Sequence, residues 1–153
     1  MSAPGAPTAI PRGFGFAECF ACGPDNARGL HLVFEREGDA VVSNYTPDAA
    51  LGGYGTILHG GLTSTLLDEA MAWAVYGLLD RLPLTTELRV RFLGPLHTGQ
   101  PLRIIGRIVS SDARGADAHA EVHNAAGELC AEGQGHLRFV SAAAVARLSR
   151  AGV

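Results

Sequence analysis

The sequence lacks the features that mark a nucleic-acid-binding or membrane-embedded protein. Basic residues are not in excess, because 12 Lys and Arg stand against 15 Asp and Glu and the formal net charge is −3 at pH 7. This balance argues against a broad nucleic-acid interface and against a polybasic membrane-binding surface. The longest apolar stretch, Met71 to Leu79, is far shorter than the roughly 20 residues of a transmembrane helix. We therefore expect neither nucleic acid nor a membrane among the partners of this chain.

Cysteine is scarce, and the sequence shows no secretory signal. The cysteines are Cys19, Cys22 and Cys130, an odd number that is typical of free thiols in a reducing compartment. The opening stretch Met1–Pro7 has neither the basic nor the apolar region of a signal peptide. From these two observations we expect a cytoplasmic protein.

The length of 153 residues predicts one domain between two short extensions. Residues 1–13, rich in Pro, Gly and Ala, predict a flexible N-terminal tail, and residues 141–153 predict a second tail or a short helix. The hydrophobic periodicity lies in residues 14–140, which we expect to form the domain. A chain of this size buries roughly 70% of its unfolded surface, so its core needs neither a disulfide nor a metal.

Hydrophobic periodicity predicts an α+β fold. Residues 60–79 are apolar on nearly every face and predict one long buried helix. The order of the predicted elements has no strand–helix–strand alternation, so we expect an antiparallel sheet of five to six strands wrapped around the helix. Gly133 and Gly135 interrupt the last strand and indicate a bulge or a close approach of another backbone. Alternating apolar and polar positions predict the strands, over 30–35, 40–45, 86–92, 102–110, 116–124 and 128–140.

The clearest chemical feature lies where this helix begins. The segment Gly55–Gly61 ends in two glycines, which allow a ligand to approach the backbone closely. The first N–H groups of a helix have no partner within the helix, and the helix dipole adds partial positive charge there. Such a helix start can stabilise a carbonyl oxygen that gains negative charge during nucleophilic attack. An ordinary glycine-rich helix start explains the same pattern.

Two neighbouring acids interrupt the apolar helix. Asp68 and Glu69 are its only charged residues before Asp80, and a buried carboxylate is costly unless it is paired or used. The two acids face different ways, because adjacent helix positions lie about 100° apart. Each can be a catalytic group or simply the partner of an arginine on the sheet.

The spacing between the helix start and Asp68 predicts a composite site. Asp68 lies eight residues after Gly60, which is about 12 Å along the helix axis. One helix therefore cannot bring both groups to the same carbonyl carbon. If both serve one reaction, a second copy of the chain must complete each site, so we expect a homodimer or a dimer of dimers (homotetramer).

The stretch around these residues resembles a known family. Residues 58–69, with the sequence LHGGLTSTLLDE, resemble the signature of hotdog-fold acyl-CoA thioesterases, most similar to the phenylacetate-pathway-like (PaaI-type) branch. Residues 85–95 resemble the strand that follows the helix in this family, and the segment Cys19–Leu30 is similar to the start of some members. The resemblance covers residues 17–140 and implies a hotdog fold and the hydrolysis of an acyl-CoA or a related acyl thioester.

The resemblance also implies a role for individual residues. Asp68 matches the acid that acts as nucleophile or general base on the thioester. The Gly60 amide, helped by Gly61, matches the oxyanion donor. His59 matches a histidine that shapes the loop and contacts the thioester oxygen.

Further positions follow from the same resemblance. Thr85 or Thr86 matches a hydroxyl that positions the attacking water in some members. Gly53 stands where some members carry an asparagine, and this departure moves the role to Tyr54 or Thr56. The implied chemistry needs no cofactor and no metal. The alternative is a non-catalytic protein of the same fold that binds acyl-CoA or another small ligand.

Candidate substrate contacts come from several elements. Trp73, Met71 and Tyr76 of the helix can line an acyl pocket or pack in the core. The arginines that can meet coenzyme A phosphates, or simply face solvent, are Arg89, Arg91, Arg103 and Arg107. The substrate-binding residues that we predict are Thr86, Glu69, Tyr54, Trp73 and Arg91.

Two groups have the residue types of a metal site, but neither predicts one. Cys19 and Cys22 have the spacing of a zinc knuckle, whereas structural zinc needs four ligands and only His31 and Cys130 are loose candidates to complete the set. A buried structural turn explains the two cysteines, and we predict no metal ligands. The second group shares one strand face, which a polar solvent-facing surface explains: His119, Glu121 and His123.

Overall fold

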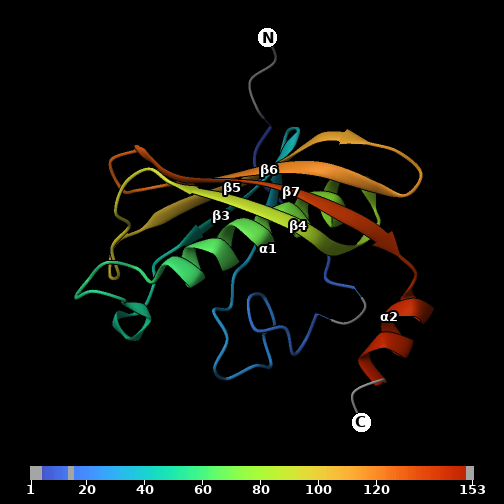
Figure 1. The fold of residues 1–153 in the computed structure, drawn as a ribbon, viewed down its shortest axis with the longest axis horizontal. Coiled ribbons are helices and arrows are strands. Elements are labelled where there is room, and N and C mark those ends of the chain that lie inside the picture. Colours follow the sequence, from blue (N-terminus) through green and yellow to red (C-terminus); the bar gives the residue numbers. More distant parts are fainter. Residues whose placement is uncertain (1–4, 14–15, 151–153) are drawn as a thin grey trace.

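The computed structural model, which describes residues 5–13 and 16–150, shows an antiparallel sheet wrapped around one long helix (Figure 1). The order of strands in the sheet is β1-β2-β3-β5-β6-β7-β4, and every neighbouring pair is antiparallel. The predicted α+β architecture is therefore confirmed. The elements in chain order are β1 (Thr8–Ala9), β2 (Glu35–Glu37), β3 (Ala40–Tyr45), the 3-10 turn η1 (Ala49–Leu51), α1 (Gly60–Leu79), β4 (Leu82–Phe92), β5 (Leu102–Ser111), β6 (Gly115–His123), β7 (Leu129–Val140) and α2 (Ala142–Arg150).

The helix α1 has the bounds that its apolar pattern predicts. It begins after His59, and it ends at Asp80, which adopts a left-handed conformation with φ of 53°. In Figure 1 the sheet lies on one side of α1 and the blue N-terminal coil lies on the other. Because both sides are covered, the helix is apolar nearly all round. Its fully buried side chains include Leu66, Leu67, Met71, Trp73 and Val75.

Glycines in the sheet allow α1 to pack closely on it. A Cβ at Gly106 of β5 would lie 2.2 Å from the Ala70 carbonyl oxygen, which no side chain tolerates. A Cβ at Gly133 would lie 3.3 Å from the Leu67 Cβ of α1. One at Gly135 would lie 3.1 Å from the Met71 Cε of α1 and 2.9 Å from the Glu87 carbonyl oxygen of β4. The predicted close approach of another backbone is thus confirmed for Gly135, whereas the close neighbour of Gly133 is the Leu67 side chain.

The strand predicted over residues 30–35 is wrong. Leu30 and Leu32 are buried and His31 between them is exposed, as the alternation indicates. However, His31 has a φ of 55°, which a strand does not accommodate. The Leu32 N–H donates to the Ala21 carbonyl oxygen at 2.9 Å instead of joining the sheet. The alternating burial of residues 30–35 therefore comes from packing in the core and not from pairing in the sheet.

The other strand predictions hold, with differences at the ends. The strand β4 begins at Leu82, four residues before the prediction, because Pro83 is tolerated in a strand at the edge of a sheet. The described residues contain seven strands instead of five to six, and the additional ones are the two-residue β1 and the three-residue β2.

The two extensions are partly structured. Thr8–Ala9 pairs with β2 as the outermost strand, which the sequence did not predict. Ala142–Arg150 forms a helix, so the short-helix alternative for the C-terminal segment is confirmed over those residues. Residues 1–4, 14–15 and 151–153 lie outside the described residues. None of the helices that the structure describes is long and apolar enough to span a membrane.

Candidate active site

The start of α1 presents one unpaired backbone N–H. His59 caps the helix, and its Nδ1 accepts a hydrogen bond from the Gly61 N–H at 2.9 Å. The His59 carbonyl oxygen accepts from the N–H groups of Leu62 and Thr63. Within the described residues no acceptor pairs with the Gly60 N–H. Of the two predicted amide donors, the structure therefore leaves Gly60 available and engages Gly61 in the cap.

An apolar pocket of about 350 Å³ opens in front of this amide. Its lining includes Gly60 and His59 from the helix start, Tyr54 from the preceding loop and Phe92 from the end of β4. Tyr54 is 89% exposed and Phe92 is 60% exposed, so both rings border the pocket with most of their surface uncovered. The sequence predicted Tyr54 but not Phe92, because nothing in the letters indicates that the end of β4 lies beside the helix start.

Asp68 lies half-buried on α1 and contacts a hydroxyl of β4. The Thr85 Oγ1 donates to Asp68 Oδ1 at 2.8 Å. In residues 5–13 and 16–150 no lysine, arginine or histidine forms a salt bridge with Asp68. The alternative of an acid paired with a sheet arginine is therefore not what the structure contains. A half-buried carboxylate without a cation keeps its second oxygen available for chemistry.

Thr86, the other threonine candidate, is turned away from Asp68. Its hydroxyl donates to the His136 carbonyl oxygen of β7 at 3.0 Å. The pairing of β4 with β7 shifts register between Thr85 and Glu87, which places the bulge at Thr86. Of the two threonines, the geometry thus brings only Thr85 to the acid.

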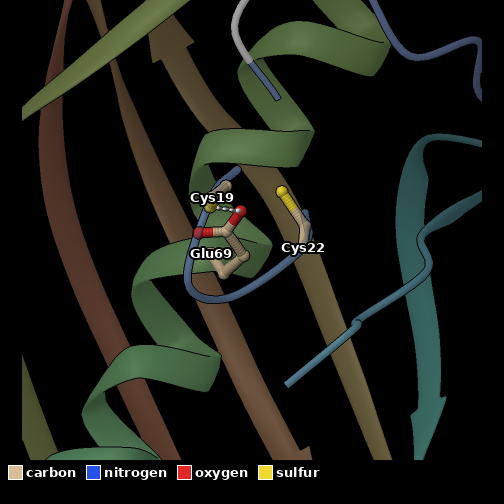
Figure 2. A group of neighbouring side chains, drawn as sticks. All are labelled: Cys19, Cys22 and Glu69. Carbon is tan, nitrogen blue, oxygen red and sulfur yellow. Dashed lines mark hydrogen bonds between the residues drawn. The ribbon is translucent and has the colours of Figure 1, made fainter. Parts of the chain in front are cut away.

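Glu69 does not join Asp68. Its Oε1 accepts from the Cys19 thiol in the N-terminal coil at 3.9 Å, and Figure 2 shows its side chain directed toward Cys19 and Cys22. Burial raises the pKa of the Glu69 carboxyl, and the hydrogen bond with Cys22 opposes this rise. The position of Glu69 against the coil argues against the predicted contact with substrate.

Two more of the predicted substrate contacts lie elsewhere. Trp73 is only 2% exposed and stacks on Phe16 and Phe34, so it belongs to the core, which corrects its assignment to a pocket wall. Arg91 forms an ion pair with Glu132 at 2.9 Å. This pair lies on the sheet face away from α1, since the adjacent partners Phe92 and Ala131 face the helix.

The polar face of β6 is explained by pairing within the sheet. His123 Nε2 is 2.8 Å from Glu121 Oε2, and His119 Nε2 is 3.6 Å from Glu132 Oε2. The opposite residues, Ala118 and Ala120, are buried. The interpretation as a polar outer surface is therefore supported by the geometry.

A comparison with protein families and curated proteins gives two matches. A family model described as the thioesterase superfamily matches residues 55–131, half of the chain. An uncharacterized protein of Schizosaccharomyces pombe is 27% identical over 110 residues, which cover 69% of this chain and 63% of that protein. The chain thus spans less than two thirds of the length of this curated relative.

Solved structures show the same fold. The thioesterase superfamily protein RHA08564 superposes with a TM-score of 0.73 and 26% identity over 82% of this chain and 61% of that one. The Escherichia coli PaaI protein from the phenylacetic acid degradation operon gives a TM-score of 0.67 and 18% identity, covering 73% and 81%. Smu.793 from Streptococcus mutans, solved with acetyl CoA, gives 0.63 and 18%, covering 67% and 82%. At 18% identity the last two similarities show the fold alone.

Proposed function

Since the chain belongs to the thioesterase superfamily and has its hotdog fold, we propose that it hydrolyses an acyl-CoA, or a related acyl thioester, to the free acid and the thiol. The observation that carries the proposal is the environment of Asp68. Its carboxylate is half-buried, has the Thr85 hydroxyl as partner and forms no ion pair with any described residue. Partial burial of a carboxylate without a cation costs folding free energy, and a catalytic role would explain why the chain keeps it.

The chemistry follows from the two halves of the site. The Asp68 carboxylate either attacks the thioester carbonyl carbon or takes a proton from a water that attacks it. In both routes the carbonyl oxygen gains negative charge, and the Gly60 N–H stabilises it. His59 holds the helix start in shape by capping it. The Thr85 hydroxyl orients the carboxylate. When the carbonyl re-forms, the C–S bond breaks and the thiolate leaves, taking a proton from the Asp68 carboxylic acid or from solvent. In the route where Asp68 attacks, water then hydrolyses the acyl–Asp68 anhydride to the free acid and restores the carboxylate.

Two copies are needed for one complete site. Asp68 and the Gly60 amide are about 12 Å apart along α1, too far for one carbonyl group. We propose a homodimer, alone or paired into a tetramer, in which Asp68 of one copy faces the Gly60 amide of the other. The described part of the sheet ends at β4, whose outer edge pairs with no other strand. This edge supports the dimer, because unpaired strand edges favour association.

The apolar surface of β4 supports the same arrangement. Leu88 and Phe92 face the side of the sheet that α1 covers, because their partners in β7, Gly135 and Ala131, lie against the helix. Nevertheless Leu88 is 39% exposed and Phe92 is 60% exposed. A second copy docked at this edge would cover both side chains. The pocket between Phe92 and Gly60 would then become an enclosed acyl or pantetheine site.

The experiment that tests the proposal is a hydrolysis assay on a panel of acyl-CoAs with detection of the free thiol. Asp68→Asn and Asp68→Ala are compared with the wild type. A loss of at least about a hundredfold in kcat/KM, or about 2.7 kcal/mol, supports the catalytic role. No turnover of any thioester by the wild type, with acyl-CoA binding retained, would identify the non-catalytic binding protein instead. The absence of asparagine at Gly53 is the sequence feature that favours this second function.

A further inference from the structure

Away from Asp68, three potential metal ligands converge between the N-terminal coil and α1. The sulfurs of Cys19 and Cys22 and a carboxylate oxygen of Glu69 all lie within 4.8 Å of one another. The Cys19 thiol is 3.9 Å from Glu69 Oε1, although these residues are 50 positions apart in the sequence. Figure 2 shows both cysteines on the coil and Glu69 projecting toward them from the helix. Because Glu69 is distant in sequence, the spacing of the two cysteines did not predict it as a third metal ligand.

The backbone around the cysteines forms a tight, fixed turn. The Gly23 N–H donates to the Cys19 carbonyl oxygen at 2.8 Å. A Cβ at Gly23 would lie 2.4 Å from the Cys19 nitrogen and 2.6 Å from the Ala17 carbonyl oxygen, so only glycine fits after the second cysteine. The N–H groups of Leu30 and Leu32 bond to the two residues between the cysteines. The backbone that carries both cysteines is thus held in place by hydrogen bonds.

The cluster contains acceptors without a balancing cation. In the part of the chain that the structure describes, Glu69 takes part in no salt bridge, and Cys22 is fully buried. Trp73 Nε1 is also buried and has no hydrogen-bond partner within the described residues. A half-buried carboxylate supported only by weak donors is costly, and a divalent cation would remove that cost.

We propose that Cys19, Cys22 and Glu69 bind a zinc ion through two thiolates and one carboxylate, with a solvent molecule as the fourth ligand. Zinc takes sulfur at about 2.3 Å and oxygen at about 2.0–2.2 Å. Tetrahedral ligand atoms at these lengths are about 3.5–3.8 Å apart. The ligand atoms now lie within 4.8 Å of one another, so their separations must shorten by up to about 1.3 Å when zinc binds.

The ligand set selects the metal. Mg²⁺ and Ca²⁺ prefer oxygen ligands, so a site with two thiolates binds them weakly. Zinc binds thiolate ligands well. Cys19 is partly exposed, which gives solvent access to the fourth position. The ion would link the coil around Cys19 and Cys22 to α1 at the residue next to Asp68. Its solvent-occupied fourth position distinguishes the site from the closed four-ligand sites of structural zinc. The binding free energy of the ion adds to the stability of the folded chain.

The test measures zinc binding by the full chain after treatment with a thiol reductant and a chelator. Zinc is titrated in competition with a chromogenic chelator, and cobalt is substituted to record visible d–d bands and a thiolate charge-transfer band. The wild type is expected to bind one zinc ion. Cys19→Ser and Glu69→Gln are expected to bind at least about a hundredfold more weakly, since even residues that only support a ligand contribute 10–100-fold.

Cys130→Ser is the matched control, because Cys130 is buried to 4% exposure but lies outside the cluster. It is expected to bind zinc as the wild type does. Circular dichroism of each metal-free variant verifies the fold. If a cysteine variant fails to fold, Glu69→Gln still tests the proposal, because glutamine has nearly the same size as glutamate. Zinc should raise the melting temperature of wild type and Cys130→Ser but not of Glu69→Gln. Equal zinc affinity in wild type and Glu69→Gln, or no stoichiometric binding by the wild type, overturns the proposal whatever the hydrolysis assay shows.

Discussion

Thr85 on β4 donates its hydroxyl to Asp68 on α1 at 2.8 Å, and this contact links the edge strand to the acid of the helix. The bulge at Thr86 directs the neighbouring hydroxyl to the β7 backbone instead. The two adjacent threonines therefore have different partners, which separates their expected effects on activity.

We expect Thr85→Ala to lower kcat for thioester hydrolysis by at least about tenfold, because a hydrogen bond to a charged group contributes about 1.5–3 kcal/mol. Thr85→Ser, which keeps the hydroxyl, should retain most activity. Thr86→Ala is the matched control and should change kcat little. Steady-state kinetics with one acyl-CoA measure all three variants. An equal loss in Thr85→Ala and Thr86→Ala would contradict the role assigned to the Asp68 contact.

The second prediction tests the Gly60 amide by removing its hydrogen. Gly60 is the first residue of α1, a position where proline is well tolerated. His59 before it has φ of −58° and ψ of 132°, outside the helical region that a following proline disfavours. Gly60→Pro should therefore fold but lose about 10²–10³-fold in kcat, as other enzymes do when an oxyanion donor is removed.

Gly60→Ala supplies the control for this change. It keeps the N–H, and its Cβ would lie 3.5 Å from the Phe92 ring, an ordinary contact. It should retain most of the activity. Denaturant unfolding of both variants shows whether the fold is preserved, and a Gly60→Pro protein that hydrolyses thioesters as fast as Gly60→Ala would remove Gly60 from the mechanism.

A third prediction concerns pH and the outer face of the sheet. The hydrogen bond from His136 Nδ1 to Asp117 Oδ1, together with one from Ser110, lowers the pKa of Asp117. Because the folded pKa lies below the unfolded value of about 3.9, this carboxylate stabilises the protein above that pH, and the effect disappears as the pH falls through the folded value.

Asp117→Asn should accordingly lower the melting temperature slightly at about pH 6 and by less at about pH 2, because the stabilisation is lost as the pH falls through the folded pKa. The effect is small because both side chains are largely exposed. Asp39→Asn makes the same charge change on an exposed turn and serves as control. Thermal melts of the three proteins at both pH values provide the measurement, and a pH-independent difference for Asp117→Asn would argue against the ion pair.

The sequence predicts elements well where one physical cause produces the pattern. The helix over 60–79 is confirmed because every side of it is covered, so an all-round apolar pattern has a single explanation. The alternation at Ala116–Val122 is also confirmed. Successive side chains of a strand point to opposite faces, and only one face of β6 is buried. The alternation at Leu30–Phe34 misled, because a coil that lies on a helix also buries every second residue.

The candidate site was predicted only where its residues are close in sequence. Asp68 and the helix start were predicted from the sequence pattern and from the family resemblance. The choice between Thr85 and Thr86 depends on a bulge, which no pattern in the sequence reveals. Glu69 and Trp73 were misplaced for a related reason. Their surroundings are set by the coil at Phe16–Cys22, which is distant in sequence and has no regular structure.

The last prediction tests the composite site by mixing two inactive variants. If Asp68 of one copy works with the Gly60 amide of the other, a dimer of one Asp68→Asn chain and one Gly60→Pro chain has one site with both changes and one site with neither. Unfolding and refolding an equal mixture should produce half mixed dimers with one intact site each, and so about a quarter of wild-type activity. Each variant refolded alone should remain inactive.

A charged residue at the β4 edge supplies the independent check. Leu88→Lys should give a monomer in sedimentation experiments and lose hydrolysis, because a lysine at this exposed apolar position opposes burial in an interface. Val109→Lys, at another exposed apolar position on β5, should leave the dimer intact. A monomeric Leu88→Lys protein with full activity, or mixed variants that recover none, would mean that each chain carries out the reaction alone, and Gly60 could then not be the donor that serves Asp68.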